Sequence, residues 1–188
     1  MKSIVIYNSQ TGFTKKYAEW ISGAADCECV ELSKAAKLNL SGYDAVVFGS
    51  WFRAGGITKL SWFKKQLPAL AAAGKKLIVF GVGASPAESP DVAVALQRAL
   101  TDEERKVIQI FYCPGGLDYG KMSAFSRFAM HLFVKMLSAK KDATEAEKKQ
   151  AEMIARSYDI SDKKYADAIA GELTGTHEPP EPRLQRCP

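Results

Sequence analysis

Five short runs rich in β-branched and aromatic residues alternate along this sequence with longer segments of helical spacing. The first, third and fourth runs are almost continuously apolar, which is typical of strands covered on both faces. The alternation therefore predicts an α/β fold, a doubly wound parallel sheet with helices on both sides. The predicted strands cover residues 2–7, 27–32, 45–50, 76–82 and 107–113.

Helices are predicted in the connections at residues 13–24, 58–73 and 90–100. The connection at residues 33–43 also has helical spacing, but it is short and contains Gly42. The sequence contains no internal repeat of fixed period.

The pattern changes after the fifth strand, where Pro114, Gly115 and Gly116 interrupt the chain. A further helix is predicted to begin at the capping-box pair Thr144 and Glu147 and to run to about residue 158. Before it, a long helix is predicted at residues 121–137, with an apolar stripe of Met122, Phe125, Ala129, Leu132, Phe133, Met136 and Leu137.

The last predicted helix covers residues 162–173, with Ser161 as its cap. We expect a single domain over residues 1–173, in which residues 114–158 form a helical insertion before this last helix. The polar, proline-rich residues 174–188 are predicted to be a disordered tail.

Length and cysteine usage restrict the class of protein. A chain of 188 residues with 47% hydrophobic residues can bury a full core without disulfides or a structural metal. No apolar stretch approaches the roughly 18 residues of a membrane span, and the apolar start is too short for a signal peptide. The cysteines form no CxxC pair and lie far from both histidines, so we expect no metal site, free thiols and a cytoplasmic protein; they are Cys27, Cys29, Cys113 and Cys187.

The net charge of +5 is concentrated in one segment, because the stretch from Lys121 to Lys141 carries five cations and no acid. Such a segment could meet nucleic acid, an anionic membrane surface or an acidic small molecule. Its cations alternate with apolar residues at helical spacing and it contains no recognised nucleic-acid motif, so we expect no nucleic-acid partner.

A hydroxyl-rich loop follows the first predicted strand and runs into the first helix. In a parallel sheet, such a loop directs backbone N–H groups and the positive end of the helix dipole at one point, where an anion can bind. The loop matches neither GxxxxGK[ST] nor GxGxxG, which favours a terminal monophosphate over a nucleoside triphosphate or a dinucleotide. The alternative is that its hydroxyls merely cap the helix. The candidate residues are Ser9, Gln10, Thr11, Gly12, Phe13 and Thr14.

The pattern S-x-T-G-x-T in this loop resembles the phosphate loop of flavodoxin-type FMN proteins, and residues 43–50 resemble their third strand. The similarity covers most of residues 1–173. It implies a flavodoxin-like five-stranded parallel sheet of order 2-1-3-4-5, with FMN at the switch point between strands 1 and 3, the arrangement for which flavodoxin is itself the standard example.

The resemblance also implies two loops along the isoalloxazine ring, one after the third strand and one after the fourth. Trp51 or Phe52 could stack on the ring, or either could be a core contact. Arg53 stands where many relatives have an aromatic residue, and we expect it near the N1–C2 edge, where a cation favours the anionic reduced flavin. The second loop could instead be a plain turn. The implied ring contacts are Ser50, Trp51, Phe52, Arg53, Ala54 and Gly55 in the first loop and Gly83, Ala84 and Ser85 in the second.

A narrower resemblance follows the fifth strand. Residues 116–122, GLDYGKM, with the basic helix after them are similar to the flavodoxin-domain group that includes menaquinone-dependent protoporphyrinogen IX dehydrogenase. This implies an FMN-dependent oxidoreductase of heme biosynthesis with a porphyrinogen and a quinone as substrates. Asp118 and Tyr119 are candidates to hold the substrate, although an Asp after a Gly-Gly turn is more often a local cap. No side chain stands out as a catalytic acid or base, and His131 is expected to be structural.

Two alternatives remain open for the function. A flavodoxin-type electron carrier would bind the same FMN and dock on a redox protein partner, but such carriers are usually acidic whereas this chain is basic. An FMN-dependent NAD(P)H:quinone reductase would be reduced directly by nicotinamide. The basic helix could lie peripherally on an anionic membrane, or its apolar stripe could pack on the sheet with the cations solvated.

Overall fold

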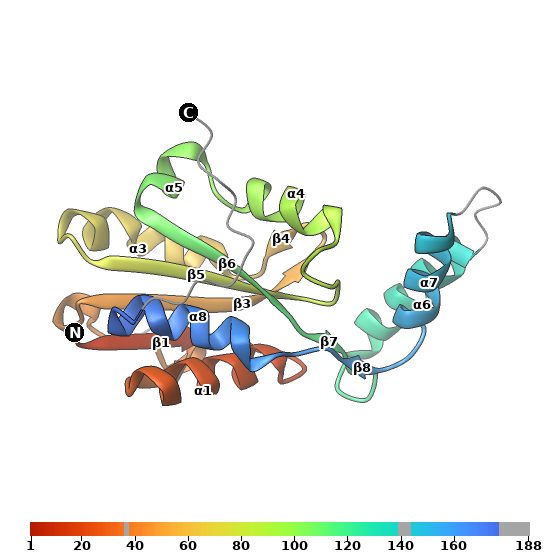
Figure 1. Ribbon diagram of the computed structural model, residues 1–188, viewed down its shortest axis with the longest axis horizontal. Helices are drawn as coiled ribbons and strands as arrows, with labels where there is room; N and C mark the ends of the chain where they lie inside the picture. Colours follow the sequence, from red (N-terminus) through yellow and green to blue (C-terminus); the bar gives the residue numbers. More distant parts are fainter. Residues whose placement is uncertain (36–37, 139–143, 177–188) are drawn as a thin grey trace.

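The computed structural model describes residues 1–35, 38–138 and 144–176 (Figure 1). Five parallel strands form a sheet of order β2-β1-β3-β5-β6, which confirms the predicted order 2-1-3-4-5, and the short β4 pairs antiparallel with β3. The strands are β1 (Ser3–Tyr7), β2 (Glu28–Glu31), β3 (Ala45–Arg53), β4 (Gly56–Ile57), β5 (Lys76–Gly83) and β6 (Ile108–Pro114).

Helices cover both faces of the sheet, as predicted (Figure 1). On one face lie α1 (Phe13–Ala25) and α8 (Lys163–Thr174), and on the other lie α2 (Leu32–Ala35), α3 (Leu60–Ala72) and α4 (Pro90–Ala99). Two shorter elements complete this part of the chain, the 3₁₀ turn η1 (Leu40–Gly42) and α5 (Asp102–Val107).

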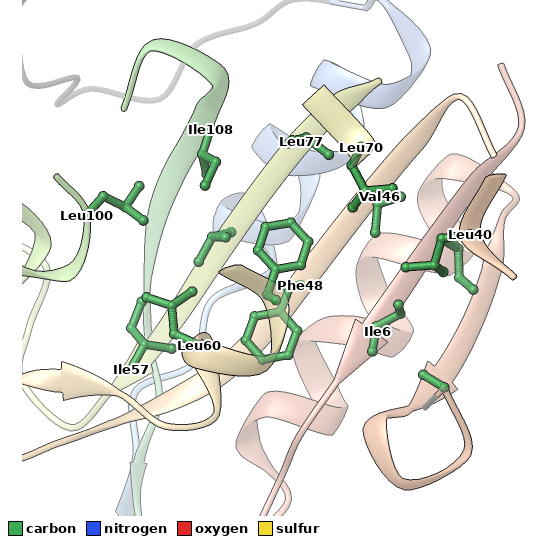
Figure 2. Close-up of a cluster of buried hydrophobic side chains, with 14 of the residues drawn as sticks. Ile6, Leu40, Val46, Phe48, Ile57, Leu60, Leu70, Leu77, Leu100 and Ile108 are labelled. Carbon is green, nitrogen blue, oxygen red and sulfur yellow. The ribbon is translucent and has the colours of Figure 1, made fainter. Parts of the chain in front are cut away.

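The core consists of two apolar layers, one on each face of the sheet. Successive residues of a strand point to opposite faces, so Val46 and Phe48 enter one layer while Ala45 and Val47 enter the other. Figure 2 shows the first layer, in which side chains of α3 pack on β1, β3 and β5. The continuous apolar runs of the sequence are therefore explained by burial on both sides.

Element boundaries differ clearly from the prediction in four places. The helix predicted to reach about residue 158 ends at Ile154, because Tyr158 and Asp159 belong to a short strand. The third strand continues to Arg53 rather than ending at Ser50, because β4 pairs back on it. The connection at residues 33–43 contains only the four-residue α2 and the turn η1 within its described residues. Helix α5 was not predicted, although Thr101 and Glu104 form a complete capping box at its start.

Between β6 and α8 the chain leaves the sheet. The short antiparallel pair β7 (Gly116–Leu117) and β8 (Tyr158–Asp159) forms the base of an insertion, and the helices α6 (Ala124–Ser138) and α7 (Glu145–Ile154) project from it away from the sheet (Figure 1). The hydroxyl of Tyr17 on α1 holds this base, because it donates to Pro114 O at 2.6 Å and accepts from Asp162 N at 3.0 Å. Both ends of the insertion are thus tied to one buried side chain.

The alternative in which the stripe of α6 packs on the sheet is wrong. Phe125, Phe128, Leu132 and Met136 are exposed, and the half-buried residues of α6 are Ser126, Met130, Val134 and Leu137. The strands β7 and β8 carry α6 away from the sheet, so that α7 is the helix against which it packs. Within the described residues, no helix is long and apolar enough to cross a membrane.

The predicted cap of the last helix is also wrong. Asp162 is the N-cap of α8, and its carboxylate accepts from Lys164 N, whereas the buried hydroxyl of Ser161 has no hydrogen-bond partner among the described residues. Ser161 precedes the N-cap position by one residue, and its backbone N–H donates to the Asp159 carboxylate. The side chain of Glu147, residues 139–143 and tail residues 177–188 lie outside the described part of the chain, so the predictions for them are not tested.

Candidate functional site

The three segments predicted to form one site follow β1, β3 and β5, which are neighbours in the sheet. Because parallel strands end at a common edge, the structure brings these segments to the same side of the molecule (Figure 1). Asn8 joins the first two: its backbone N–H donates to Gly49 O at 2.9 Å and its side-chain amide donates to Ser50 Oγ at 3.0 Å. Asn8 was not among the predicted site residues.

The candidate phosphate loop leaves the start of α1 without a side-chain cap. Gly12 is the N-cap residue, with φ 101°, and no side chain caps the helix; Ser9 Oγ instead accepts from Gly12 N at 3.2 Å. A Cβ at Gly12 would meet nothing within 4 Å, so the space beside this backbone is open. The first-turn N–H groups of α1 are therefore free for an external acceptor, and helix capping does not explain the hydroxyls of this loop.

Thr14 adds a second observation. The residue is only 2% exposed, yet its hydroxyl has no hydrogen-bond partner in the described part of the chain. Ser161 Oγ is the one fully buried polar side-chain atom without a partner in the described chain, so the Thr14 hydroxyl keeps some exposure and can donate to a ligand. The neighbouring lysines already have acidic partners, since Lys15 pairs with Glu19 at 3.6 Å and Lys16 with Asp159 at 2.8 Å. The loop thus offers N–H and O–H donors at a helix N-terminus, which fits a phosphate group.

The other members of the loop have different positions. Gln10 is exposed, and Ser9 and Thr11 are half-buried. The ring of Phe13 lies against the base of the insertion, since a Cβ on Gly116 would stand 3.0 Å from Phe13 Cζ. Phe13 therefore packs against the protein rather than towards a ligand.

Ser50 belongs to a buried polar network at the end of β3. Its side chain is fully buried, accepts from Asn8 and lies 2.7 Å from the hydroxyl of Thr58, which in turn donates to Trp51 O at 3.1 Å. This network fixes the point where the chain leaves β3. Sequence reasoning missed Thr58, because it lies seven residues beyond Trp51 and is brought back only by the β3–β4 pairing.

The segment predicted as a ring-contacting loop is a tight β-hairpin. Arg53 pairs with Gly56, so Ala54 and Gly55 alone form the turn, with φ of 49° and 78°. Two successive positive φ angles are what a type I′ turn requires. Arg53 is exposed next to this turn and has no ion-pair partner within the described ranges.

The two aromatic residues before the turn differ. Phe52 packs in the core: a Cβ on Gly81 would lie 2.2 Å from its ring, and its ring centre is 5.8 Å from that of Tyr112. Trp51 is half-buried and takes no part in the ring contacts found among the described residues. Of the two candidates for stacking on a planar ligand, Trp51 is therefore the one whose ring is still available.

Replacing Ala54 by asparagine is expected to raise the free energy of unfolding by about 1 kcal/mol, because alanine is strained at a positive φ that asparagine tolerates. Urea denaturation with circular dichroism measures the effect. The matched control is Ala72→Asn at the end of α3, which should lower the stability slightly, since asparagine is the poorer helix former. Equal losses at both positions would contradict the strained turn.

The loop of Gly83, Ala84 and Ser85 is held from two other elements. The Tyr112 hydroxyl of β6 donates to Ser85 O at 2.7 Å, and the Tyr158 hydroxyl of β8 donates to Ala84 O at 2.6 Å. Burial raises the pKa of Tyr158 to about 12 and also raises the pKa of Tyr112, so both phenols stay protonated donors near neutral pH. Two distant tyrosine hydroxyls therefore fix the position of this loop.

Asp118 and Tyr119 both have internal partners. Asp118 accepts from Lys121 N at 3.2 Å and pairs with its side chain at 3.1 Å, and that hydrogen bond lowers the pKa of Asp118. The hydroxyl of Tyr119 donates to Ile154 O, and its ring stacks on His131 with 5.2 Å between ring centres. Local capping and packing within the insertion account for these residues, including His131.

An open pocket of about 470 Å³ lies between the phosphate loop and the base of the insertion. The insertion therefore adds a wall beside the loop that the sequence did not reveal. The pocket is lined by Thr11, Gly12, Phe13 and Lys16 from the loop side and by Leu117, Asp118, Lys121, Ser157, Tyr158 and Asp159 from the insertion.

Three of the four cysteines lie in the described part of the chain. Cys27 and Cys29 are half-buried on β2 and its approach, Cys113 is fully buried, and all three thiols are free. Burial raises the pKa of Cys27 to about 11, which keeps this thiol protonated. In the part of the chain that the structure describes, no three His, Cys, Asp or Glu side chains gather as metal ligands.

The comparison with protein families decides the classification. The family model for the flavodoxin domain matches residues 4–144, three quarters of the chain. The chain belongs to the flavodoxin domain family. Family membership indicates a flavin as the cofactor, and the uncapped start of α1 with its free hydroxyl fits the phosphate end of FMN.

Three of the solved structures similar to this chain are described as flavodoxins or flavoproteins. A flavodoxin from the domain Archaea is 18% identical over 93% of this chain and 99% of its own, with a TM-score of 0.40. A flavodoxin, WrbA-like protein from Agrobacterium tumefaciens is 15% identical over 94% of this chain and 99% of its own, with a TM-score of 0.42. A flavoprotein from Lactobacillus acidophilus, solved in complex with FMN, is 16% identical over 60% of this chain and 91% of its own, with a TM-score of 0.40. No curated protein matches the chain.

Proposed function

We propose that this protein is an FMN-dependent oxidoreductase of the protoporphyrinogen dehydrogenase-like group, passing electrons from a reduced substrate to a quinone or similar acceptor. The observation that carries the cofactor assignment is the start of α1, where uncapped N–H groups stand beside the unpaired hydroxyl of Thr14. When bound, FMN supplies the electron-accepting chemistry.

The chain's own residues hold and orient the cofactor. Gly12 would give the phosphate close access to the backbone, and Thr14 would donate to a phosphate oxygen. The β3–β4 hairpin and the loop of Ala84 and Ser85 are the segments that would hold the ring. Tyr112 and Tyr158 keep that second loop in place through their hydrogen bonds to its carbonyls.

Arg53 is the cation assigned to the N1–C2 edge of the ring. It is exposed next to the hairpin turn, and within the described residues no acid neutralises it. A nearby positive charge stabilises the anionic reduced flavin, so it raises the midpoint potential. If the flavin bound to Arg53→Ala has the same midpoint potential as the flavin in the unmodified protein, Arg53 does not stabilise the reduced flavin.

The insertion supports an enzyme rather than a simple carrier. Its first residues, 116–122, resemble the protoporphyrinogen dehydrogenase group, and its base lines the pocket beside the phosphate loop. The charge of +5 does not suit the basic partners on which acidic carriers dock. The free thiols fit a reducing compartment, which supports a cytoplasmic location.

An anaerobic potentiometric titration of the FMN-reconstituted protein is the first test. Uptake of two electrons in one step is expected for the proposed enzyme, and reduction by protoporphyrinogen with reoxidation by a menaquinone analogue should follow. Two well-separated one-electron steps without porphyrinogen turnover would favour an electron carrier. Rapid reduction by NAD(P)H would favour the quinone reductase, and failure to bind FMN would remove all three.

A further inference from the structure

Helix α6 presents an apolar face that no described residue covers. Phe125 is 69% exposed, Phe128 67%, Leu132 59% and Met136 62%. Their spacing of three, four and four residues places them on one side of the helix, and we refer to these four residues as the α6 face. Phe133 of α6 is 40% exposed as well. The remaining large exposed apolar residues of the described chain stand singly outside α6: Met1, Leu38, Val94 and Val107.

The opposite side of α6 is already occupied. Met130, Val134 and Leu137 are half-buried on the side that packs with α7, where Ala151 and Ile154 are buried. The α6 face therefore cannot close on α7. It also cannot close on the sheet, since β7 and β8 carry α6 away from it (Figure 1).

Charge determines which partner suits the α6 face. No acid occurs between Lys121 and Lys141, and Arg127 and Lys135 of α6 have no ion-pair partner within the described ranges. Two copies joined through this face would bring cations against cations, which disfavours a dimer. A nucleic acid would pair with the cations but would leave the phenylalanines in water. An anionic lipid bilayer accommodates both the cations and the apolar side chains, because the apolar side chains enter the acyl boundary while the cations meet the headgroups.

The length of α6 fixes how it meets such a bilayer. The helix has 15 residues, which gives about 22 Å at 1.5 Å per residue, less than the roughly 30 Å of a hydrocarbon core. It can lie in the surface plane but cannot cross it.

We propose that α6 docks this protein on an anionic lipid bilayer, lying in the plane of the surface with the α6 face inserted and Arg127 and Lys135 at the headgroups. Docking is independent of the redox function proposed above, because the α6 face contributes no residue to the candidate flavin site or its pocket. Failure of either proposal therefore leaves the other standing.

Co-sedimentation of the full FMN-loaded chain with vesicles tests docking. We expect binding to vesicles with 30% phosphatidylglycerol to exceed binding to pure phosphatidylcholine at least about tenfold, and to weaken in high salt. Phe128→Ser with Leu132→Ser should lower binding at least about tenfold through lost apolar burial. Arg127→Gln with Lys135→Gln should lower it roughly 30-fold, as expected for two cations near an anionic surface.

Matched controls separate docking from general effects. Val94→Ser removes an exposed apolar side chain from α4, and Lys34→Gln with Arg98→Gln removes two exposed cations from α2 and α4; neither variant should change vesicle binding. Phe128→Trp should show a blue-shifted emission with anionic vesicles only. Equal binding to both vesicle types, or equal losses in the control variants, would overturn the proposal. So would a dimer in sedimentation velocity that Phe128→Ser with Leu132→Ser dissociates.

Discussion

Replacing Thr14 by valine is expected to lower the affinity for FMN about 10- to 100-fold, the contribution of one hydrogen bond to a charged group. The hydroxyl of Thr14 has no partner within the described protein although the residue is 2% exposed, so the phosphate supplies the bond that the fold leaves open. Titration of the apo-protein with FMN, followed by flavin fluorescence, measures the dissociation constant.

The same substitution distinguishes a binding role from a structural one. Because the Thr14 hydroxyl makes no bond in the described protein, the stability of the apo-form should not fall. Thr101→Val is the matched control: it breaks the capping box of α5, where Thr101 accepts from Glu104 N, and should lower the stability while the affinity for FMN stays unchanged. An unaltered FMN affinity in Thr14→Val would remove Thr14 from the phosphate site.

Replacing Gly49 by alanine is expected to lower the free energy of unfolding by about 3 kcal/mol. Gly49 pairs with Phe80 across β3 and β5, and a Cβ on it would stand 2.0 Å from Phe80 Cζ, with two more ring atoms within 2.5 Å. Phe80 is fully buried, so its ring has no free space into which it can move. Urea denaturation followed by circular dichroism measures the loss.

Gly23→Ala is the matched control for this substitution. Gly23 lies within α1 and a Cβ there meets nothing within 4 Å, so alanine should raise the stability by about 0.5 kcal/mol through its higher helix propensity. A loss in Gly49→Ala no larger than the change in Gly23→Ala would show that the Phe80 ring can move away. Because Gly49 O accepts from Asn8 N beside the phosphate loop, the destabilised variant should also bind FMN more weakly.

Most of the sheet could be predicted from residue pattern alone. A strand covered on both faces must be apolar at every position, and a helix with one buried side must repeat every three or four residues, so β1, β3 and β5 and helix α1 were readable directly. The phosphate loop was equally local, because its loop and the start of α1 occupy six consecutive residues. Strand order came from the family resemblance rather than from the pattern.

The sequence located the loop of Ala84 and Ser85, but it did not reveal the hydrogen bonds that hold this loop. Ala84 and Ser85 follow a readable strand, yet the hydroxyls that hold them belong to Tyr158 and Tyr112, which lie 74 and 27 residues later in the chain. No local pattern marks a tyrosine as the donor to a distant carbonyl. The same holds for Tyr17, whose hydroxyl joins residues 97 and 145 positions away.

Helix α6 shows most clearly which properties follow from the sequence alone and which depend on the tertiary structure. The sequence by itself predicted an amphipathic, basic helix at residues 121–137, which the structure places at Ala124–Ser138, because period and charge are properties of consecutive residues. It could not say which apolar side is buried, since α6 carries two: Met130, Val134 and Leu137 pack with α7, while Phe125, Phe128 and Leu132 stay exposed. Only the tertiary structure decided this, because the paired strands β7 and β8, whose flanking residues Pro114 and Asp162 bond to Tyr17, carry α6 beyond the reach of the sheet. Which side of a helix is buried depends on where the chain places its neighbours, and that placement is set by contacts between residues far apart in the sequence.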